Sequence, residues 1–390
     1  MARVRTGLEI LLQDHTRLLK GKRVGLVAHQ ASVDSSLQHA IDLLQSLKGV
    51  RLSALFAPEH GLWGAAQDHA QIPSARDRRT GCRVLSLYGR RRAPTLEMLR
   101  DLDLLVLDLQ DVGARYYTFI WTMALTLSAC GQAKIPLIVL DRPNPLGGTR
   151  LEGNVLDPRF TSFVGLCPIP VVHGMTMGEL ACLFNERFGL GARLRVVPMR
   201  GWRRAMSWEE TGLHWVAPSP NMPTPDTARV YPGACLLEGT NLSEGRGTTR
   251  PFEYAGAPFL DAHEWADSLN RQNLPGVRFR PCYFEPTFHK YKGQLCGGVQ
   301  WHVGDAARFK PYLTGLAVIA TARRLAPKRF AWRKPPYEFE RKKLPFDLLC
   351  GTDRIRRQIE AGRPLRAIEA SWQRELAAFK RLRQRVLLYR

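Results

Sequence analysis

Apolar runs alternate with helical patterns over the first part of the chain. Unbroken apolar runs predict buried strands at 23–28, 50–56, 102–109, 135–140 and 194–199. Apolar residues at helical spacing predict helices at 7–12, 35–47 and 116–130. Strands that are apolar along their whole length and alternate with helices are typical of a parallel sheet covered on both faces. We therefore predict an α/β fold for this region.

The pattern changes after residue 260. It predicts helices at 262–269, 309–323, 353–361 and 367–382, and short strands at 277–281 and 298–303. We expect a mostly parallel sheet domain over residues 1–230 and a smaller α+β domain over residues 231–390. No glycine-rich loop opens a helix after the first strand, so the fingerprint of a dinucleotide-binding domain is absent.

Polar residues stand where three of the predicted strands end. They are Glu59, His60, Gln110, Asp111, Arg115, Tyr116, Asp141, Arg142 and Asn144. In open parallel sheets, ligands bind beyond the carboxyl ends of the strands. Turn formation and helix capping would explain each cluster alone. The three clusters together predict a functional site at one edge of the sheet.

The most polar internal stretch is residues 238–253, which read EGTNLSEGRGTTRPFE. It contains almost no apolar residues, which argues against a core strand or an amphipathic helix. A solvated loop with casual ion pairs is one interpretation. We favour a polar binding surface for a hydroxyl-rich ligand, because its interleaved charges can neutralise one another when partly buried. The candidate contact residues are Glu238, Asn241, Glu244, Arg246, Thr248 and Glu253.

Two polar residues between these regions are further candidates. His173 precedes a predicted helix whose N-cap is Thr176, with Glu179 completing a capping box. A position ahead of a helix N-terminus suits an anion, although a lone histidine is more often a packing residue. Asn221 lies in a proline-rich turn, which we expect to expose it.

The chain is strongly basic, with 57 Lys and Arg against 35 Asp and Glu and a formal net charge of +22. Such an excess favours anionic partners, and nucleic acid is the first to consider. The basic runs are scattered without interleaved aromatics, and the glutamates of 238–253 would repel phosphate. We therefore expect no specific nucleic-acid partner.

Metal and membrane signals are missing from the sequence. The eight cysteines form no CxxC pair, and no HExxH motif occurs. We expect no metal and no cofactor. No apolar run approaches the ~20 residues of a membrane span, and the first residues do not resemble a signal peptide. As written, the chain is expected to be cytoplasmic, or periplasmic or secreted if an export signal has been removed.

Several long motifs resemble a known enzyme family. They are PEHGLWG, QDVGARYYTF, LDRPNPLGG, HGMTMGELA, PSPNMPT and YPGACLLEGTNLSEGRGTTRPFE. In the same order, they resemble the exo-β-N-acetylmuramidases of glycoside hydrolase family 171, formerly a family of unknown function. The resemblance implies a Rossmann-like N-terminal domain, a smaller C-terminal domain and an active-site cleft between them. It also implies release of terminal N-acetylmuramic acid from the non-reducing end of peptidoglycan saccharides or muropeptides, in cell-wall turnover and recycling.

The resemblance implies that Glu59, in the PEHG motif, is the proton donor. Glycoside hydrolysis often uses a second carboxylate as well. The candidates for that role are Asp111, Glu238, Glu244 and Glu253. Assistance by the 2-acetamido group of the substrate is an alternative, and Asp111 or Asn221 would then orient that amide.

Muramic acid carries a lactyl carboxylate, for which a bidentate arginine is the best partner. Arg246 and Arg142 are the leading candidates, and Arg115 is a third. Two competing functions remain at this point. One is a glycosidase of the same fold that acts on another amino sugar. The other is a non-catalytic basic protein that binds nucleic acid or cell wall.

Overall fold

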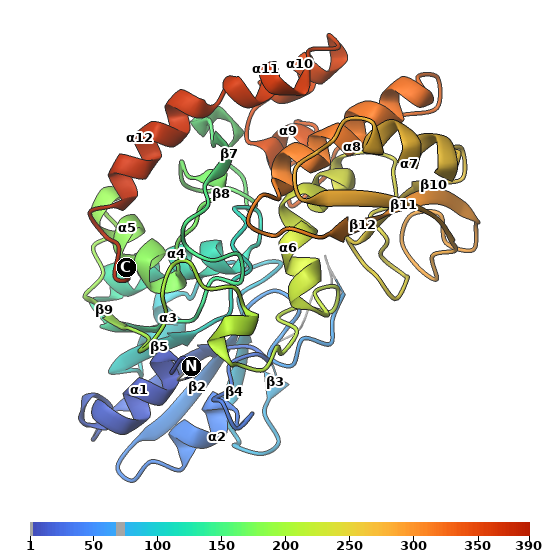
Figure 1. The fold of residues 1–390 in the computed structure, drawn as a ribbon. Helices are drawn as coiled ribbons and strands as arrows, with labels where there is room; N and C mark the ends of the chain where they lie inside the picture. Colours follow the sequence, from blue (N-terminus) through green and yellow to red (C-terminus); the bar gives the residue numbers. More distant parts are fainter. Residues whose placement is uncertain (1–2, 68–74) are drawn as a thin grey trace.

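A seven-stranded sheet forms the centre of the first domain in the computed structural model, which describes residues 3–67 and 75–390 (Figure 1). The strand order is β3-β4-β2-β1-β5-β6-β9. The strands are β1 (Arg23–Ala28), β2 (Arg51–Ala57), β3 (Ala75–Arg76), β4 (Arg83–Ser86), β5 (Leu104–Asp108), β6 (Leu137–Leu140) and β9 (Leu194–Val197). All neighbours pair in parallel except β3 and β4. The predicted fold class is confirmed.

Strand β1 stands in the middle of the sheet, between β2 and β5. The chain first builds outward through β2 and β4, and then crosses to the other side to add β5, β6 and β9. The strand order therefore reverses between β1 and β5. Such a reversal opens a crevice at the carboxyl ends of the strands, which is where open α/β sheets bind ligands.

Helices cover both faces of this sheet. They are α1 (Gly7–Asp14), α2 (Ala40–Gln45), α3 (Leu96–Leu99), α4 (Phe119–Ala133) and α5 (Met177–Arg187). The predicted cap of α5 is confirmed, because Thr176 and Glu179 form a capping box. Helix α4 is apolar on nearly every side and runs through the core. Short 3-10 turns lie at Thr16–Leu18, Pro158–Phe160 and Glu209–Thr211.

A three-stranded antiparallel sheet forms the second, smaller domain (Figure 1). Its strands, in the order β10-β12-β11, are β10 (Tyr254–Ala257), β11 (Val277–Phe284) and β12 (Cys296–Val303). Helices α7 (Ala262–Asn270) and α8 (Pro311–Leu325) pack on it. Helix α6 (Pro225–Ala234), followed by a 3-10 turn at Cys235–Gly239, leads into this domain. The boundary expected between residues 230 and 231 falls inside α6.

The remaining elements lie along the junction of the two domains. They are β7 (Glu152–Val155), β8 (Pro170–Val172), α9 (Pro345–Cys350), α10 (Arg354–Glu360), α11 (Leu365–Ala370) and α12 (Gln373–Arg383). The single helix predicted at 367–382 is two helices, because the chain turns at Ser371 and Trp372. Trp372 is buried there, against Tyr312 of α8. No helix among the described residues is long and apolar enough to cross a membrane.

The last residues of the chain return to the first domain. Helix α12 runs back along it, and the chain ends near α5 (Figure 1). The guanidinium of Arg383 donates to the carbonyl of Gly174 at 2.6 Å and to that of Gly148 at 3.0 Å. The hydroxyl of Tyr389 donates to Asp141 at 2.6 Å. Residues assigned to the second domain by sequence thus complete the packing of the first.

Candidate active site

Glu59 lies in the turn that follows β2 and is only 6% exposed. The turn is tight, since His60 has a φ of 67° and its Nδ1 lies 2.8 Å from the carbonyl oxygen of Ala66. Thr118, the residue before α4, donates its hydroxyl to Oε2 of Glu59 at 2.7 Å. The turn after β2 thus supplies the carboxyl group, and the N-terminus of α4 supplies the hydroxyl that donates to it.

Tyr88 and Glu338 complete the surroundings of Glu59. The Tyr88 hydroxyl lies within hydrogen-bonding reach of Glu59, and 3.2 Å from Oε2 of Glu338. Burial, together with the two carboxylates, raises the pKa of Tyr88, so its hydroxyl keeps its proton. One hydroxyl can donate to only one carboxylate at a time. The Tyr88 hydroxyl therefore links the two glutamates through a single shared donor.

A narrow pocket of about 40 Å³ opens beside Glu59, between the two domains. The residues around it include Glu59, His60, Tyr116, Tyr117, Thr118, Asn221, Tyr231, Glu238, Arg246, Tyr337 and Glu338. Ligand sites typically measure about 300–1,000 Å³. A sugar can therefore enter only when the lining side chains move outward.

Arg246 is the one arginine that lines this pocket among the described residues. Its Nη2 lies 2.8 Å from Oε1 of Glu238, and its guanidinium stacks 4.9 Å from the ring centre of Phe252. The other carboxylate oxygen of Glu238 accepts a 2.6 Å hydrogen bond from Tyr337. Of the six candidates in the stretch 238–253, Glu238 and Arg246 are the two that reach the pocket.

Glu244 lies behind the pocket and is fully buried. Lys290 Nζ contacts its Oε2 at 2.9 Å, while His289 and the Arg246 Nε contact its Oε1 at 3.1 and 3.3 Å. Burial alone would raise the pKa of Glu244, but these cations outweigh it and hold the pKa well below the usual range. An always-ionised, enclosed carboxylate is suited to bracing the loop, so the geometry does not support its predicted catalytic role.

Asp111 and His173 form a buried pair, with His173 Nε2 3.3 Å from Oδ2 of Asp111. The backbone N–H of Met175 donates to His173 Nδ1 at 3.3 Å, which places the ring proton on Nε2, facing the carboxylate. The backbone N–H of Gly113 donates to the same Oδ2 at 2.8 Å. The structure brings these two separate candidates together, but the pair lies outside the lining of the pocket.

The other two candidate arginines are occupied elsewhere. Arg115 is fully buried and donates to four carbonyl oxygens, those of Asn154, Ile169, Leu349 and Cys350. Arg142 forms a two-pronged pair with Asp108, at 2.5 and 2.7 Å. Neither guanidinium lines the pocket beside Glu59, so the structure does not support the predicted role of either in binding substrate there.

The remaining strand-end candidates hold the backbone in place. Asp141 accepts from Thr176, Tyr389 and the backbone of Gly178, and burial raises its pKa to about 6. The side chains of Gln110, Asn144 and Tyr116 donate to backbone carbonyl groups, at Pro143, Met175 and Pro232 respectively. Of these, Tyr116 alone also lines the pocket.

Most of the stretch 238–253 is buried rather than exposed as a binding surface. The Asn241 side chain bonds to the backbone of Arg329 and Ala331, and Thr248 donates to the carbonyl of Gly245. Glu253 accepts from Thr227 and Arg250. Asn221, predicted to be exposed, is 6% exposed and donates to Gln67 at the rim of the pocket.

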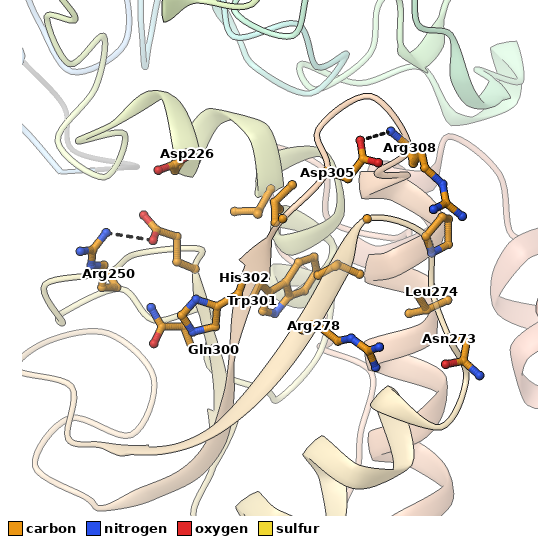
Figure 2. Close-up of a pocket in the computed structure, with 17 residues that line it drawn as sticks. Asp226, Arg250, Asn273, Leu274, Arg278, Gln300, Trp301, His302, Asp305 and Arg308 are labelled. Carbon is orange, nitrogen blue, oxygen red and sulfur yellow. Dashed lines mark hydrogen bonds and ion pairs between the residues drawn. The ribbon is translucent and has the colours of Figure 1, made fainter.

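The largest cavity lined by described residues lies away from Glu59, between α6 and the strands β11 and β12 (Figure 2). It measures about 690 Å³, and Figure 2 shows Arg250 at one side with Arg278 and Arg308 at the other. Its carboxylates already have partners: Glu253 pairs with Arg250, and Asp226 with Arg229. Asp305, which also lines the cavity, accepts from the backbone N–H groups of Ala307 and Arg308. With these carboxylates engaged, the cavity is a weaker candidate for catalysis than the pocket beside Glu59.

Sequence reasoning missed Tyr88, Thr118 and Glu338. Tyr88 follows β4, a strand of four residues with mixed polarity that carries no clear apolar run. Glu338 lies in a loop between α8 and α9 with no periodic pattern. Thr118 falls inside the helix predicted at 116–130, whereas α4 begins at Phe119, so its place just before the helix was not foreseen. In residues 3–67 and 75–390, no cluster of His, Cys, Asp and Glu is arranged to hold a metal ion.

Comparison with known proteins agrees with this geometry. The N-terminal domain model of the exo-β-N-acetylmuramidase NamZ matches residues 24–226, and the C-terminal domain model matches residues 229–389. The peptidoglycan β-N-acetylmuramidase NamZ of Bacillus subtilis (strain 168) is 47% identical over 387 residues, covering 99% of this chain and 92% of that protein.

Two crystal structures of DUF1343 family proteins from Bacteroides fragilis share the fold. One superimposes with a TM-score of 0.90 at 37% identity, and each chain is covered completely. The other has a TM-score of 0.78 at 30% identity, with 100% of this chain and 99% of that one covered. The resemblance first carried by the motifs is confirmed, and the chain belongs to the exo-β-N-acetylmuramidase NamZ family.

Proposed function

We propose that this protein is an exo-β-N-acetylmuramidase, which hydrolyses the bond of a terminal, non-reducing N-acetylmuramic acid in peptidoglycan saccharides or muropeptides. The observation that carries the proposal is Glu59, buried beside a pocket with Thr118, Tyr88 and a second glutamate around it. Family membership supplies the substrate class. A role in cell-wall turnover and recycling follows from that substrate.

Glu59 is the general acid of this mechanism. It transfers its proton to the glycosidic oxygen as the bond to the anomeric carbon breaks. The partners of its carboxyl group in the described structure, Thr118 and Tyr88, are neutral hydroxyls. Neutral donors orient a carboxyl group without fixing a negative charge on it as a cation would. The two hydroxyls therefore hold the carboxyl group in place for proton transfer.

Glu338 is our candidate for the second carboxylate. Both carboxylates reach the Tyr88 hydroxyl, so they lie close together. Retaining glycosidases hold their two carboxyl groups ~5–5.5 Å apart and inverting ones ~6.5–9.5 Å apart. A pair that shares one hydroxyl favours the shorter range, and we therefore expect retention of configuration. Assistance by the 2-acetamido group would also retain it, with Glu338 then orienting the amide.

Arg246 is our candidate partner for the lactyl carboxylate. Its guanidinium lines the same pocket as Glu59, whereas Arg115 and Arg142 are occupied elsewhere. The Glu238 and Tyr337 side chains hold it in place from one side. A substrate carboxylate that approached from the pocket would share this guanidinium with Glu238. Glucosamine-terminated fragments lack that carboxylate and should be poor substrates.

The test is release of N-acetylmuramic acid from a disaccharide that carries this sugar at its non-reducing end. The wild type should release it, and Glu59→Gln should lower kcat by about 10²–10⁴-fold while its melting temperature stays unchanged. A matched disaccharide that begins with N-acetylglucosamine is the substrate control. Equal rates for wild type and Glu59→Gln would refute the role of Glu59, and no release by the wild type would refute the function.

A further inference from the structure

A second cavity, of about 470 Å³, borders the pocket beside Glu59. The two share Tyr337 and Glu338 as a common wall. Tyr88, whose hydroxyl reaches both glutamates, also lines the larger cavity. Its volume falls within the range of about 300–1,000 Å³ that is typical of ligand sites. The narrow pocket thus adjoins a space large enough for sugar rings.

Phe339 presents an exposed aromatic ring in this cavity. The residue is 47% exposed and lines the cavity, so its ring is accessible to a ligand there. Its ring packs edge-on against Tyr88 at 5.6 Å and Phe163 at 6.1 Å, so it is held firmly. Fixed aromatic faces lose little side-chain entropy on binding, which makes them good platforms for apolar ligand faces.

The backbone at this position is strained. Glu338 and Phe339 are consecutive non-glycine residues with φ values of 44° and 69°. A single residue in this region costs about 1–3 kcal/mol and persists only when its surroundings fix it. The strain directs the Glu338 carboxylate toward Tyr88 and leaves the neighbouring ring in the open cavity. This turn therefore places the Glu338 carboxylate beside the narrow pocket and the Phe339 ring in the larger cavity.

Arginines surround the ring. Arg92 lies 4.9 Å from the ring centre of Phe339, and Arg333 lies 5.6 Å from that of Tyr337. Arg341 lines the same cavity. None of the three makes an ion pair with a carboxylate in the described part of the chain. The cavity therefore combines a stacking surface with uncompensated positive charge, which suits a carbohydrate that carries carboxylates.

We propose that this cavity is the leaving-group subsite, which binds the sugar on the reducing side of the bond that is cleaved. That sugar stacks on Phe339, and Arg333 and Arg341 attract the carboxylate-bearing residues that follow it in the chain. The inference rests on the proposed function. The assignment follows from shape, because an enzyme that acts at a chain end holds the terminal sugar in the closed space and extends the rest toward the open one.

The experiment compares Phe339→Ala with the wild type on two substrates. The first is the disaccharide of N-acetylmuramic acid and N-acetylglucosamine, which fills the subsite. The second is N-acetylmuramyl β-fluoride, whose leaving group has no ring. Phe339→Ala should raise KM for the disaccharide by about tenfold and leave KM for the fluoride unchanged. Arg341→Gln should raise KM for a tetrasaccharide more than for the disaccharide.

Tyr283→Ala is the matched control, since Tyr283 is 56% exposed and lines neither cavity. It should leave KM for both substrates unchanged. An equal loss of Phe339→Ala on both substrates would overturn the proposal, because the ring would then serve the muramic acid or the shape of Glu338. Unchanged kinetics on both would overturn it as well.

A calorimetric titration separates this inference from the proposed function. The ligand is the disaccharide of N-acetylglucosamine and N-acetylmuramic acid that a longer chain would release. Binding to the wild type should weaken about tenfold in Phe339→Ala. If the wild type cleaves nothing but binds this ligand through Phe339, the function fails and the subsite stands. Equal affinity of the two proteins would overturn the subsite.

Discussion

Glu59 and Glu244 are two buried glutamates with opposite surroundings. Both come from polar stretches of sequence, and they are 6% and 0% exposed. The partners of Glu59 in the described structure are hydroxyl groups, on Thr118 and Tyr88. Glu244 is enclosed by cationic partners, foremost Lys290. A carboxyl group that must gain and lose a proton needs neutral donors, whereas one that braces a loop needs fixed positive charge.

The comparison explains why residue type alone does not separate the proposed roles of the two glutamates. In the sequence, both glutamates stand in turn-forming segments with a glycine close by, Gly61 for Glu59 and Gly245 for Glu244. Folding brings Lys290, 46 residues later, against one of them. It brings Tyr88 and Thr118 against the other. The partners decide the function, and they come from distant parts of the chain.

Neutralising Glu244, which is paired with Lys290, should have the largest effect on stability. In Glu244→Gln, the Lys290 ammonium loses its buried counter-charge, which should lower the free energy of unfolding by about 3–5 kcal/mol. Chemical denaturation measures this loss. Glu253→Gln is the matched control, because its cationic partner Arg250 is 47% exposed and the loss should stay below about 1 kcal/mol. If Glu244→Gln lowered the free energy of unfolding no more than Glu253→Gln does, the role of Glu244 in bracing the loop would be contradicted.

Removing the shared hydroxyl should affect catalysis more than folding. Tyr88→Phe keeps the ring between Phe163 and Phe339 but leaves the two glutamates without their common donor. We expect kcat to fall about 10–100-fold, with the acid and base limbs of the pH–rate profile displaced. Stopped assays across pH measure both. A lower kcat with an unshifted profile would mean that the hydroxyl only positions the carboxyl groups.

A buried neutral histidine extends the comparison to pH. His29 ends β1, where its Nε2 accepts from the backbone of Gln110 and its Nδ1 contacts the carbonyl of Pro218. Burial, with a contribution from Arg142, lowers the pKa of His29 to about 3. The unfolded chain takes up a proton near pH 6.5 and the folded one does not, so stability is lost as pH falls below 6.5.

At pH 5 the loss from His29 should be about 2 kcal/mol relative to pH 7. His29→Gln retains a donor and an acceptor but does not titrate, so its unfolding free energy should change less over this range. The difference between the two proteins isolates the histidine from Asp141 and Glu152. Burial raises the pKa of those two groups to about 6 and about 7, and they act in the opposite direction. Parallel pH profiles for the two proteins would disprove the assignment.

Local patterns were sufficient for the framework of the first domain. Strand β1 spans Arg23–Ala28, as its unbroken apolar run predicts, because both faces of the sheet are covered. The capping box at Thr176 and Glu179 is also local and was recognised. The three strand ends do share one edge of the sheet. That rule correctly placed Glu59 near the pocket.

Prediction from the sequence was least accurate for polar residues that the fold buries. The stretch 238–253 looked like a solvent-facing surface, but salt bridges and backbone contacts allow most of it to be buried. Arg115 was a candidate partner for a substrate carboxylate, yet its Nη1 and Nη2 donate to four backbone carbonyl oxygens. Tyr88 and Glu338 are 250 residues apart, and no local signal links them. Such pairings become visible only in three dimensions.

The return of the chain to its first domain has a consequence for synthesis. Asp141 is buried beneath α5, and one of its hydrogen-bond donors is Tyr389, 248 residues further on. Leu388 likewise donates its backbone N–H to Glu179 of the same helix. During synthesis, the residues of the first domain emerge from the ribosome before these donors have been added to the chain. The hydrogen bonds to Asp141 and Glu179 can therefore form only after the C-terminal residues have emerged, and the packing of the first domain is completed last.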